Sequence, residues 1–146
     1  MSDNTTVNLV LLKEDYAAHK SIFHRYGRSP LCEWTEKEGV LVCVLTFEDV
    51  DCAQLNIEDD LQALCIPFTK TWGPGLEYGE GTEDFRIRSD GSTILFSGDD
   101  IDTFSYAEVK RSFEKDEIAD LLEDRVLDIL LLRWENQKPI IDSMIR

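Results

Sequence analysis

The sequence predicts an α+β fold, in which an antiparallel sheet of about four to six strands has helices packed on it and a long C-terminal helix follows. Two observations lead to this prediction. Apolar segments of strand length are joined by tight-turn sequences at 31–47 and 84–97, and the last third of the chain repeats its apolar residues at helical spacing. The 146 residues contain no repeat or linker and suffice for one core. We therefore expect a single compact domain spanning residues 1-146.

The N-terminal strands are predicted from short apolar segments. Residues 7–12, VNLVLL, are short, apolar and β-branched at the start, as in a buried strand. The segments Leu31–Thr35 and Val40–Phe47 flank Glu36–Gly39, which has the composition of a hairpin turn with Gly39 at its special position. Val40–Phe47 is apolar on both faces, which predicts either a central strand with a packed layer on each side or a strand edge deep in a small core.

A second hairpin is the clearest in the chain. Its predicted strands are Asp84–Arg88 and Thr93–Ser97, joined at Asp90-Gly91. In the first strand the apolar residues Phe85 and Ile87 alternate with two arginines. This alternation predicts one buried face and one face in water.

Two helices are predicted in the first half of the chain. Lys13–Tyr26 places apolar residues at roughly helical spacing, and Gly27 follows as a stop signal. Asn56 is a good N-cap, and three acidic residues follow it in the first turn, where the helix dipole favours them. Pro67 is expected to end this helix.

The C-terminal third is predicted to be helical. Ser105 and Glu108 have the spacing of a capping box, which predicts a helix over about Tyr106–Ser112. A long helix follows over about Lys115–Asn136, and Pro139 permits one more turn because proline is tolerated at a first helical position. The apolar residues of the long helix share one face, as in an amphipathic helix: Ile118, Leu121, Leu122, Val126, Ile129 and Leu130.

Composition limits the classes of function. Thirty Asp and Glu face fifteen Lys and Arg, giving a net charge of −15 that is spread over both halves of the chain. Such a field repels nucleic acid and anionic lipid and attracts basic partners. The N-terminus MSDNTTVN has no basic or apolar leader pattern, and no apolar run approaches the ~20 residues that span a bilayer. We therefore expect a cytoplasmic protein that binds neither membrane nor nucleic acid directly.

Cysteine and histidine spacing gives no metal or catalytic signature. Cys32, Cys43, Cys52 and Cys65 lie 11, 9 and 13 residues apart, without the close pairs that zinc sites need, and we expect free thiols. The two histidines, at positions 19 and 24, lack the H-E-x-x-H spacing. No catalytic residue, metal or cofactor is predicted, and a non-catalytic protein is favoured over an enzyme.

A row of aspartates is the first candidate partner-binding feature. Acidic residues recur every four positions on the predicted long helix at Asp116, Asp120, Asp124 and Asp128. Successive carboxylates would lie ~6 Å apart along the axis, close to the ~6.8 Å between alternate phosphates of a DNA strand. Other acids that widen the patch are Glu117, Glu123, Asp99, Asp100 and Asp102. The alternative is an ordinary solvated helix face.

The glycine-rich segment Thr71–Asp84, TWGPGLEYGEGTED, is the second candidate. It matches neither the P-loop nor the dinucleotide fingerprint, and its acids repel phosphate. One interpretation is a glycine-rich lead into the hairpin with Trp72 and Tyr78 folded onto the core. The other is a loop that offers Trp72, Glu77 and Tyr78 to a partner, because Trp and Tyr are typical interface anchors.

These features lead to three hypotheses on function. The first is a non-catalytic acidic interaction protein, in its most specific form an inhibitor that occupies a basic nucleic-acid-binding surface of a partner protein. The second is a small-molecule-binding or enzymatic domain that uses Thr71–Asp84. The third is a structural subunit of a larger assembly, for which an exposed apolar helix face would be the signature.

Overall fold

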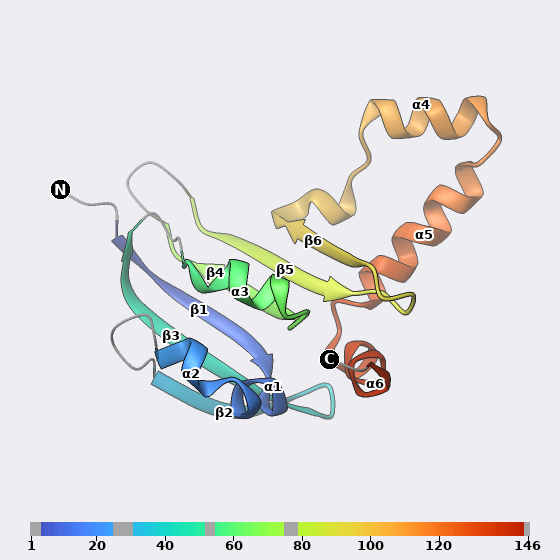
Figure 1. Ribbon diagram of the computed structural model, residues 1–146. Coiled ribbons are helices and arrows are strands. Elements are labelled where there is room, and N and C mark those ends of the chain that lie inside the picture. The colour runs from blue at the N-terminus through green and yellow to red at the C-terminus, as the bar shows by residue number, and fades with distance from the viewer. Residues whose placement is uncertain (1–3, 25–30, 52–54, 75–78, 145–146) are drawn as a thin grey trace.

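The computed structural model describes residues 4–24, 31–51, 55–74 and 79–144, apart from the side chains of residues 31, 32, 49, 51, 99 and 100. Within this part of the chain, six strands form one antiparallel sheet in the order β2-β3-β1-β4-β5-β6 (Figure 1). The predicted α+β class is therefore confirmed. The strands are β1 (Asn4–Leu12), β2 (Leu31–Lys37), β3 (Val40–Asp51), β4 (Phe68–Trp72), β5 (Gly81–Ile87) and β6 (Thr93–Ser97). The helices are α1 (Lys13–Ala18), α2 (Lys20–His24), α3 (Ile57–Ala63), the 3-10 helix η1 (Gly98–Asp102), α4 (Tyr106–Glu114), α5 (Ile118–Leu130) and α6 (Trp134–Ser143).

Both predicted hairpins are present. In the first, Lys37 pairs with Val40 across a two-residue turn at Glu38 and Gly39, whose φ angles are 54° and 78°. A turn with positive φ at both positions matches the twist of the flanking strands, and this explains the glycine. In the second, Ile87 pairs with Thr93, and Gly91 has a φ of 88°.

The sheet carries an apolar core on each face. The larger core joins β1, β3, β4 and β5 to α1, α2 and α3, which lie across one face of the sheet in Figure 1. The smaller core joins β1, β3 and β5 to α6. Cys43 and Leu45 of β3 belong to the larger core, and Val40 and Val42 to the smaller one. The prediction that this strand is covered on both faces is confirmed.

The first predicted helix is divided in two. It was expected over Lys13–Tyr26, but α1 ends at Ala18 and α2 begins at Lys20. His19 between them has a φ of −129°, outside the helical range. The amide of His19 still donates to the carbonyl oxygens of Asp15 and Tyr16, and the carbonyl of His19 accepts from Ile22, so the chain changes direction without losing these hydrogen bonds.

The next helix begins after the predicted N-cap Asn56, but it ends at Ala63, before the predicted stop at Pro67. The side chain of Asn56 makes no capping hydrogen bond. A carboxylate oxygen of Glu58 instead accepts from the amide of Leu55 at 3.3 Å. At the other end Cys65 has a φ of 54°, and the amide of the following Ile66 donates back to Leu61 at 2.9 Å. This is a Schellman ending, and it stops the helix before Pro67.

Arg86 was expected on the wet face of β5, but its side chain is buried, with 1% exposed. Its guanidinium donates to the carbonyl oxygens of Phe68 at 2.7 Å, Leu131 at 3.0 Å and Leu132 at 3.1 Å. It also lies 4.2 Å from the centre of the Trp134 ring. Burial lowers the pKa of Arg86 to about 10, so the group stays charged at neutral pH. The reason for the failed prediction is that the turn after α5 covers this face.

The predicted long C-terminal helix is also divided. It was expected over about Lys115–Asn136, but α5 ends at Leu130, and α6 begins at Trp134 after a residue with ψ of 129°. Pro139 was expected at a first helical position, but it lies inside α6. The carbonyl groups of Leu131 and Leu132 are taken by Arg86, and this anchors the break between the helices. None of the described helices is long and apolar enough to cross a membrane.

Candidate interaction surface

Helices α4 and α5, here called the arm, project away from the edge of the sheet formed by β6 (Figure 1). The chain leaves the sheet through η1, runs out along α4 and returns along α5 to α6. α5 contains no buried residue along its 13 positions. α5 therefore differs from α1, α2, α3 and α6, each of which contains buried residues, and α4 buries Ser112 alone.

The first turn of the arm is set by the predicted capping box. The hydroxyl of Ser105 accepts from the amide of Glu108 at 3.1 Å, and the carboxylate of Glu108 accepts from the amide of Ser105 at 2.8 Å. These two bonds satisfy backbone donors that a helix start leaves open. The backbone bond from Ser105 holds the pKa of the Glu108 carboxyl below its usual value.

Arg125 ties the two helices of the arm to the segment that leads into them. Its guanidinium lies 4.3 Å from the centre of the Phe104 ring and donates to the carbonyl oxygens of Ile101, at 3.0 Å, and Thr103. It also lies 3.5 Å from a carboxylate oxygen of Glu108. One side chain of α5 thus holds the start of α4 in place.

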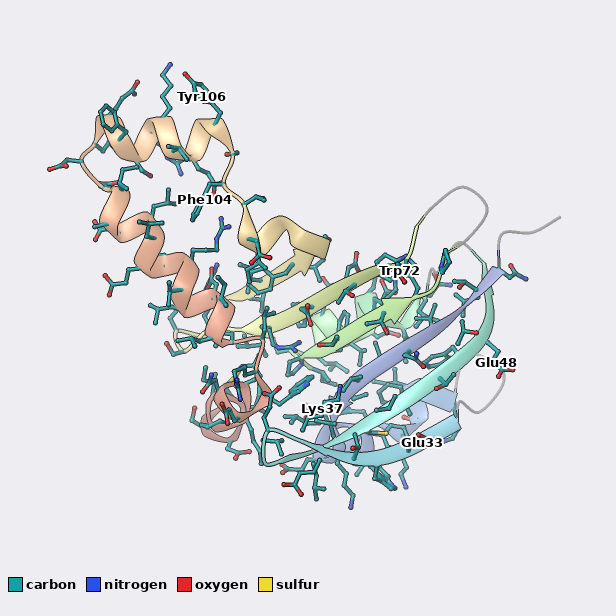
Figure 2. All side chains as sticks on the ribbon, turned by 180° about the vertical axis from the view of Figure 1, so that it is seen from behind. Glu33, Lys37, Glu48, Trp72, Phe104 and Tyr106 are labelled. Carbon is teal, nitrogen blue, oxygen red and sulfur yellow. The ribbon has the colours of Figure 1, made fainter. Side chains whose placement is uncertain are left out.

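The apolar residues of α4 face solvent. Tyr106 is 81% exposed, Phe113 is 76% exposed and Val109 is 42% exposed. Their spacing of three and four residues puts them on one side of the helix. Figure 2 shows Tyr106 on the side of α4 away from α5, whereas Phe104 lies on the side that faces it. Large aromatic side chains are rarely left in water without a reason.

The apolar face of α5 is exposed as well, although the amphipathic pattern is typical of a face that packs on a core. Five of its apolar side chains are between 37% and 56% exposed. They are Leu122, Val126, Leu127, Ile129 and Leu130. The sheet face that these residues would need is taken instead by α6 and by the turn that precedes it. We call the exposed apolar side chains of α4 and α5 the arm surface.

The four aspartates do not form the continuous row expected from their spacing. Asp116 has a φ of 56° and lies in the turn that closes α4, outside α5. Asp128 receives two hydrogen bonds from Arg88, at 2.9 and 3.0 Å, and its side chain is mostly buried. Asp120 and Asp124 remain as exposed neighbours on α5.

The acids expected to widen the patch are placed as follows. Glu117 and Glu123 are exposed beside Asp120 and Asp124, so the structure brings these four onto or next to α5. Asp102 is exposed at the end of η1. Asp99 and Asp100 also lie in η1, but their side chains are outside the described ones.

In the glycine-rich segment, Trp72 is folded back on the sheet. Its indole nitrogen donates to the carbonyl of Gly79 at 3.2 Å, and the ammonium of Lys70 lies 5.0 Å from its ring centre. A Cβ atom at Gly81 would lie 2.2 Å from the ring, so this glycine makes room for the tryptophan. This arrangement fits the first interpretation of the segment, a lead into the hairpin. Glu77 and Tyr78 lie outside the described residues.

A cavity of about 380 Å³ also touches this segment. Its lining includes Trp72, Glu80, Gly81 and Thr82. Figure 2 shows Trp72 over the strands and Tyr106 at the far end of the arm, so the two candidate features are separate. A larger cavity, of about 680 Å³, lies elsewhere, between α5 and α6.

The thiols and possible metal ligands add no further site. Cys43 is buried and Cys65 half-buried, whereas Cys52 lies outside the described residues and only the backbone of Cys32 is described. Within the described part of the chain, no group of three or more His, Cys, Asp or Glu residues could hold a metal ion.

Comparison of the chain with protein-family models, with curated proteins and with solved structures found no match. The candidate interaction surface is therefore supported by the geometry of this structure alone. Sequence reasoning missed the exposed aromatics of α4, although Tyr106, Val109 and Phe113 already showed helical spacing. The spacing indicates a shared face, but it does not say whether that face meets the core or solvent.

Proposed function

We propose that the protein is a non-catalytic, cytoplasmic interaction protein that binds a basic protein partner through the arm surface. The observation that carries this proposal is the exposure of Tyr106 and Phe113, at 81% and 76%, on a helix pair that projects from the sheet. Exposed apolar patches mark interaction sites, and aromatic residues are frequent binding hot spots. The cytoplasmic location is an inference from the composition and from the cysteine spacing of the sequence.

Charge supports a basic partner. Residues 118–130 carry four acids, Asp120, Glu123, Asp124 and Asp128, against one base, Arg125, which gives a net charge of −3 for α5. The whole chain carries −15. A positively charged partner would be steered toward this surface, and an acidic one repelled.

Occupation of a nucleic-acid-binding surface is the most specific form of this proposal. Of the four aspartates only the exposed pair Asp120 and Asp124 still supports it, because Asp116 lies outside the helix and Asp128 is bound by Arg88. If this specific form holds, the double variant Asp120→Asn, Asp124→Asn binds the partner more weakly than the wild type does. Nucleic acid then also competes with the protein for the same surface of the partner.

The test uses the protein immobilised on beads and a cell lysate, with captured proteins quantified by mass spectrometry. The wild type is compared with the double variant Tyr106→Ser, Phe113→Ser and with Leu95→Ser, which changes an exposed apolar residue on β6. We expect a partner whose capture falls roughly tenfold or more in the double variant and is unchanged in Leu95→Ser. Each capture is repeated at about 50 mM and about 500 mM salt, where screening differs strongly.

Three outcomes would contradict the proposal in whole or in part. If every captured partner binds the double variant as strongly as it binds the wild type, the arm surface is not the binding site. Partners lost equally in Leu95→Ser would indicate non-specific adhesion. Capture that is the same at both salt concentrations would reject the charge-based choice of a basic partner and leave only the apolar contact.

A further inference from the structure

A cavity of about 680 Å³ is lined by residues of three elements: the turn between β5 and β6, the C-terminal half of α5, and α6. Figure 1 shows where these elements lie in the fold. We call it the α5–α6 pocket. Its volume falls in the range of about 300–1,000 Å³ that is typical of small-molecule sites. Tyr106, Val109 and Phe113 of the arm surface take no part in its lining.

One wall of the pocket is apolar. It is formed by Leu127, Leu130, Leu131 and Ile140. Leu127 is 56% exposed and Leu130 is 46% exposed, although both line a concave surface. A ligand with an apolar part would remove these side chains from water, and this burial favours binding by about 25 cal/mol per Å².

The polar lining carries an excess of negative charge. Arg88, the cation of the pocket, is engaged by Asp128 through two hydrogen bonds at 2.9 and 3.0 Å, and the same contact raises the pKa of Arg88. Asp90 and Asp124 also line the pocket. Three carboxylates against one guanidinium leave a net charge of −2 among the lining residues.

The carboxylates of Asp90 and Asp124, unlike that of Asp128, make no hydrogen bond to Arg88 and can accept hydrogen bonds from a ligand. One oxygen of Asp90 accepts from the hydroxyl and the amide of Ser92, at 2.6 and 2.9 Å, and these bonds hold the pKa of Asp90 below its usual value. Asp124 is exposed on α5. The amide nitrogen of Asn136 donates to the carbonyl of Leu130 at 2.9 Å, so the amide oxygen of Asn136 adds a further acceptor. The C-terminal end of α5, which the helix dipole makes negative, lies in the same lining.

We propose that the α5–α6 pocket binds an organic cation, an ammonium or guanidinium group on an apolar stem. The cation would lie against Asp90 and Asp124, and the stem against Leu127 and Leu130. Anionic ligands are excluded by the negative lining. This chemistry has two sources, a free amine or the Lys or Arg side chain of a partner protein. The pocket shares Leu127 and Leu130 with the arm surface, but the proposal goes beyond the proposed function because it does not require a partner bound at Tyr106 and Phe113.

The test is a titration of the full chain followed by NMR. Each probe has a chain of four carbon atoms, which in butyrate includes the carboxyl carbon: n-butylguanidinium, n-butylammonium, neutral n-butanol and anionic butyrate. We expect the two cations to shift the methyl signals of Leu127, Leu130 and Ile140 and the side-chain amide of Asn136, with a Kd on the order of 1 mM. Butanol should bind more weakly, and butyrate should cause no saturable shift.

Variants separate a local from a global charge effect. Asp124→Asn should weaken binding of the cations roughly 2- to 5-fold. Asp59→Asn removes the same charge from an exposed position of α3, outside the pocket, and should leave the Kd unchanged. Equal weakening by both variants would overturn the proposal, as would saturable butyrate binding at these signals or the absence of saturable shifts with either cation up to about 50 mM.

A short peptide identifies the source of the cation. The capped tripeptide Leu-Arg-Leu presents the guanidinium on a protein backbone with apolar neighbours. Tighter binding of this peptide than of n-butylguanidinium assigns the pocket to a partner's basic side chain, and weaker binding assigns it to a free amine. The double variant Tyr106→Ser, Phe113→Ser should bind both probes with the same Kd as the wild type. The pocket proposal can therefore hold even if no partner binds through Tyr106 and Phe113.

Discussion

Gln137 shows how a single side chain completes the edge of a strand. β4 starts at Phe68, which pairs with Phe85, so Ile87 extends past the end of that neighbouring strand. The fully buried amide of Gln137 takes its place: its oxygen accepts from the amide of Ile87 at 2.8 Å, and its nitrogen donates to the carbonyl of Ile87 at 2.9 Å. Buried backbone groups need such partners, and this requirement explains a polar residue with 0% exposure.

At this scale we predict that Gln137→Leu lowers the free energy of unfolding by about 2–5 kcal/mol, because it leaves two buried backbone groups without partners. The measurement is urea unfolding followed by circular dichroism. Gln62→Leu on α3 is the matched control, because Gln62 is half-buried and its side chain makes no hydrogen bond to another described residue. A similar loss of stability in both variants would show that the Gln137 amide is not specifically required.

At the scale of the element, the turn between α4 and α5 explains why Asp116 lies outside the predicted row of aspartates. The amide of Glu117 donates to Ser112 at 2.7 Å, and that of Asp116 donates to Phe113 at 3.2 Å. These are the two bonds of a Schellman ending, and they require a positive φ at Asp116, observed at 56°. Glycine adopts this conformation more readily than aspartate.

The same substitution should therefore have opposite effects at two positions four residues apart. Asp116→Gly should raise the free energy of unfolding by about 0.5–1 kcal/mol, because the strained φ is relieved. Asp120→Gly, inside α5, should lower it by roughly 0.5–1 kcal/mol. Both variants remove one exposed negative charge, and the helix dipole adds to the expected difference because Asp120 lies in the first turn of α5, whereas Asp116 follows the end of α4. Thermal unfolding of the two variants checks this, and a shift of the same sign in both would contradict the helix boundary at Ile118.

At the scale of the whole molecule, two neighbouring helices differ in how they are held. α6 buries Trp134, Gln137 and Ile141, whereas α5 buries no residue. The two helices are joined by the turn that Arg86 anchors to the sheet. Local opening requires less free energy where fewer apolar contacts are lost.

We therefore predict that amide hydrogens of α5 exchange with solvent roughly 100-fold faster or more than those of α6. The measurement is native-state hydrogen exchange by NMR at low protein concentration. α6 serves as the internal control because it has similar length and lies next to α5. Equal protection of both helices would mean that the arm surface is covered in solution.

Several features were readable from the sequence because their causes lie within a few residues. The hairpin turn at Gly39, the capping box of Ser105 and Glu108, and the two-sided strand Val40–Phe47 all follow from local spacing, and all are present. The net charge of −15 needs no structure at all. The α+β class followed from these local patterns taken together.

Other features depend on which distant segments come together. An arginine that alternates with apolar residues reads as solvent-facing, but carbonyl groups of Leu131 and Leu132, 45 and 46 positions away, satisfy the guanidinium of Arg86 and allow its burial. The apolar face of α5 reads as a core face, but α6 and that same turn take the sheet surface, so α5 stays outside. Periodicity shows which residues share a face of an element, whereas burial depends on the surface that meets this face, and that surface comes from elsewhere in the chain.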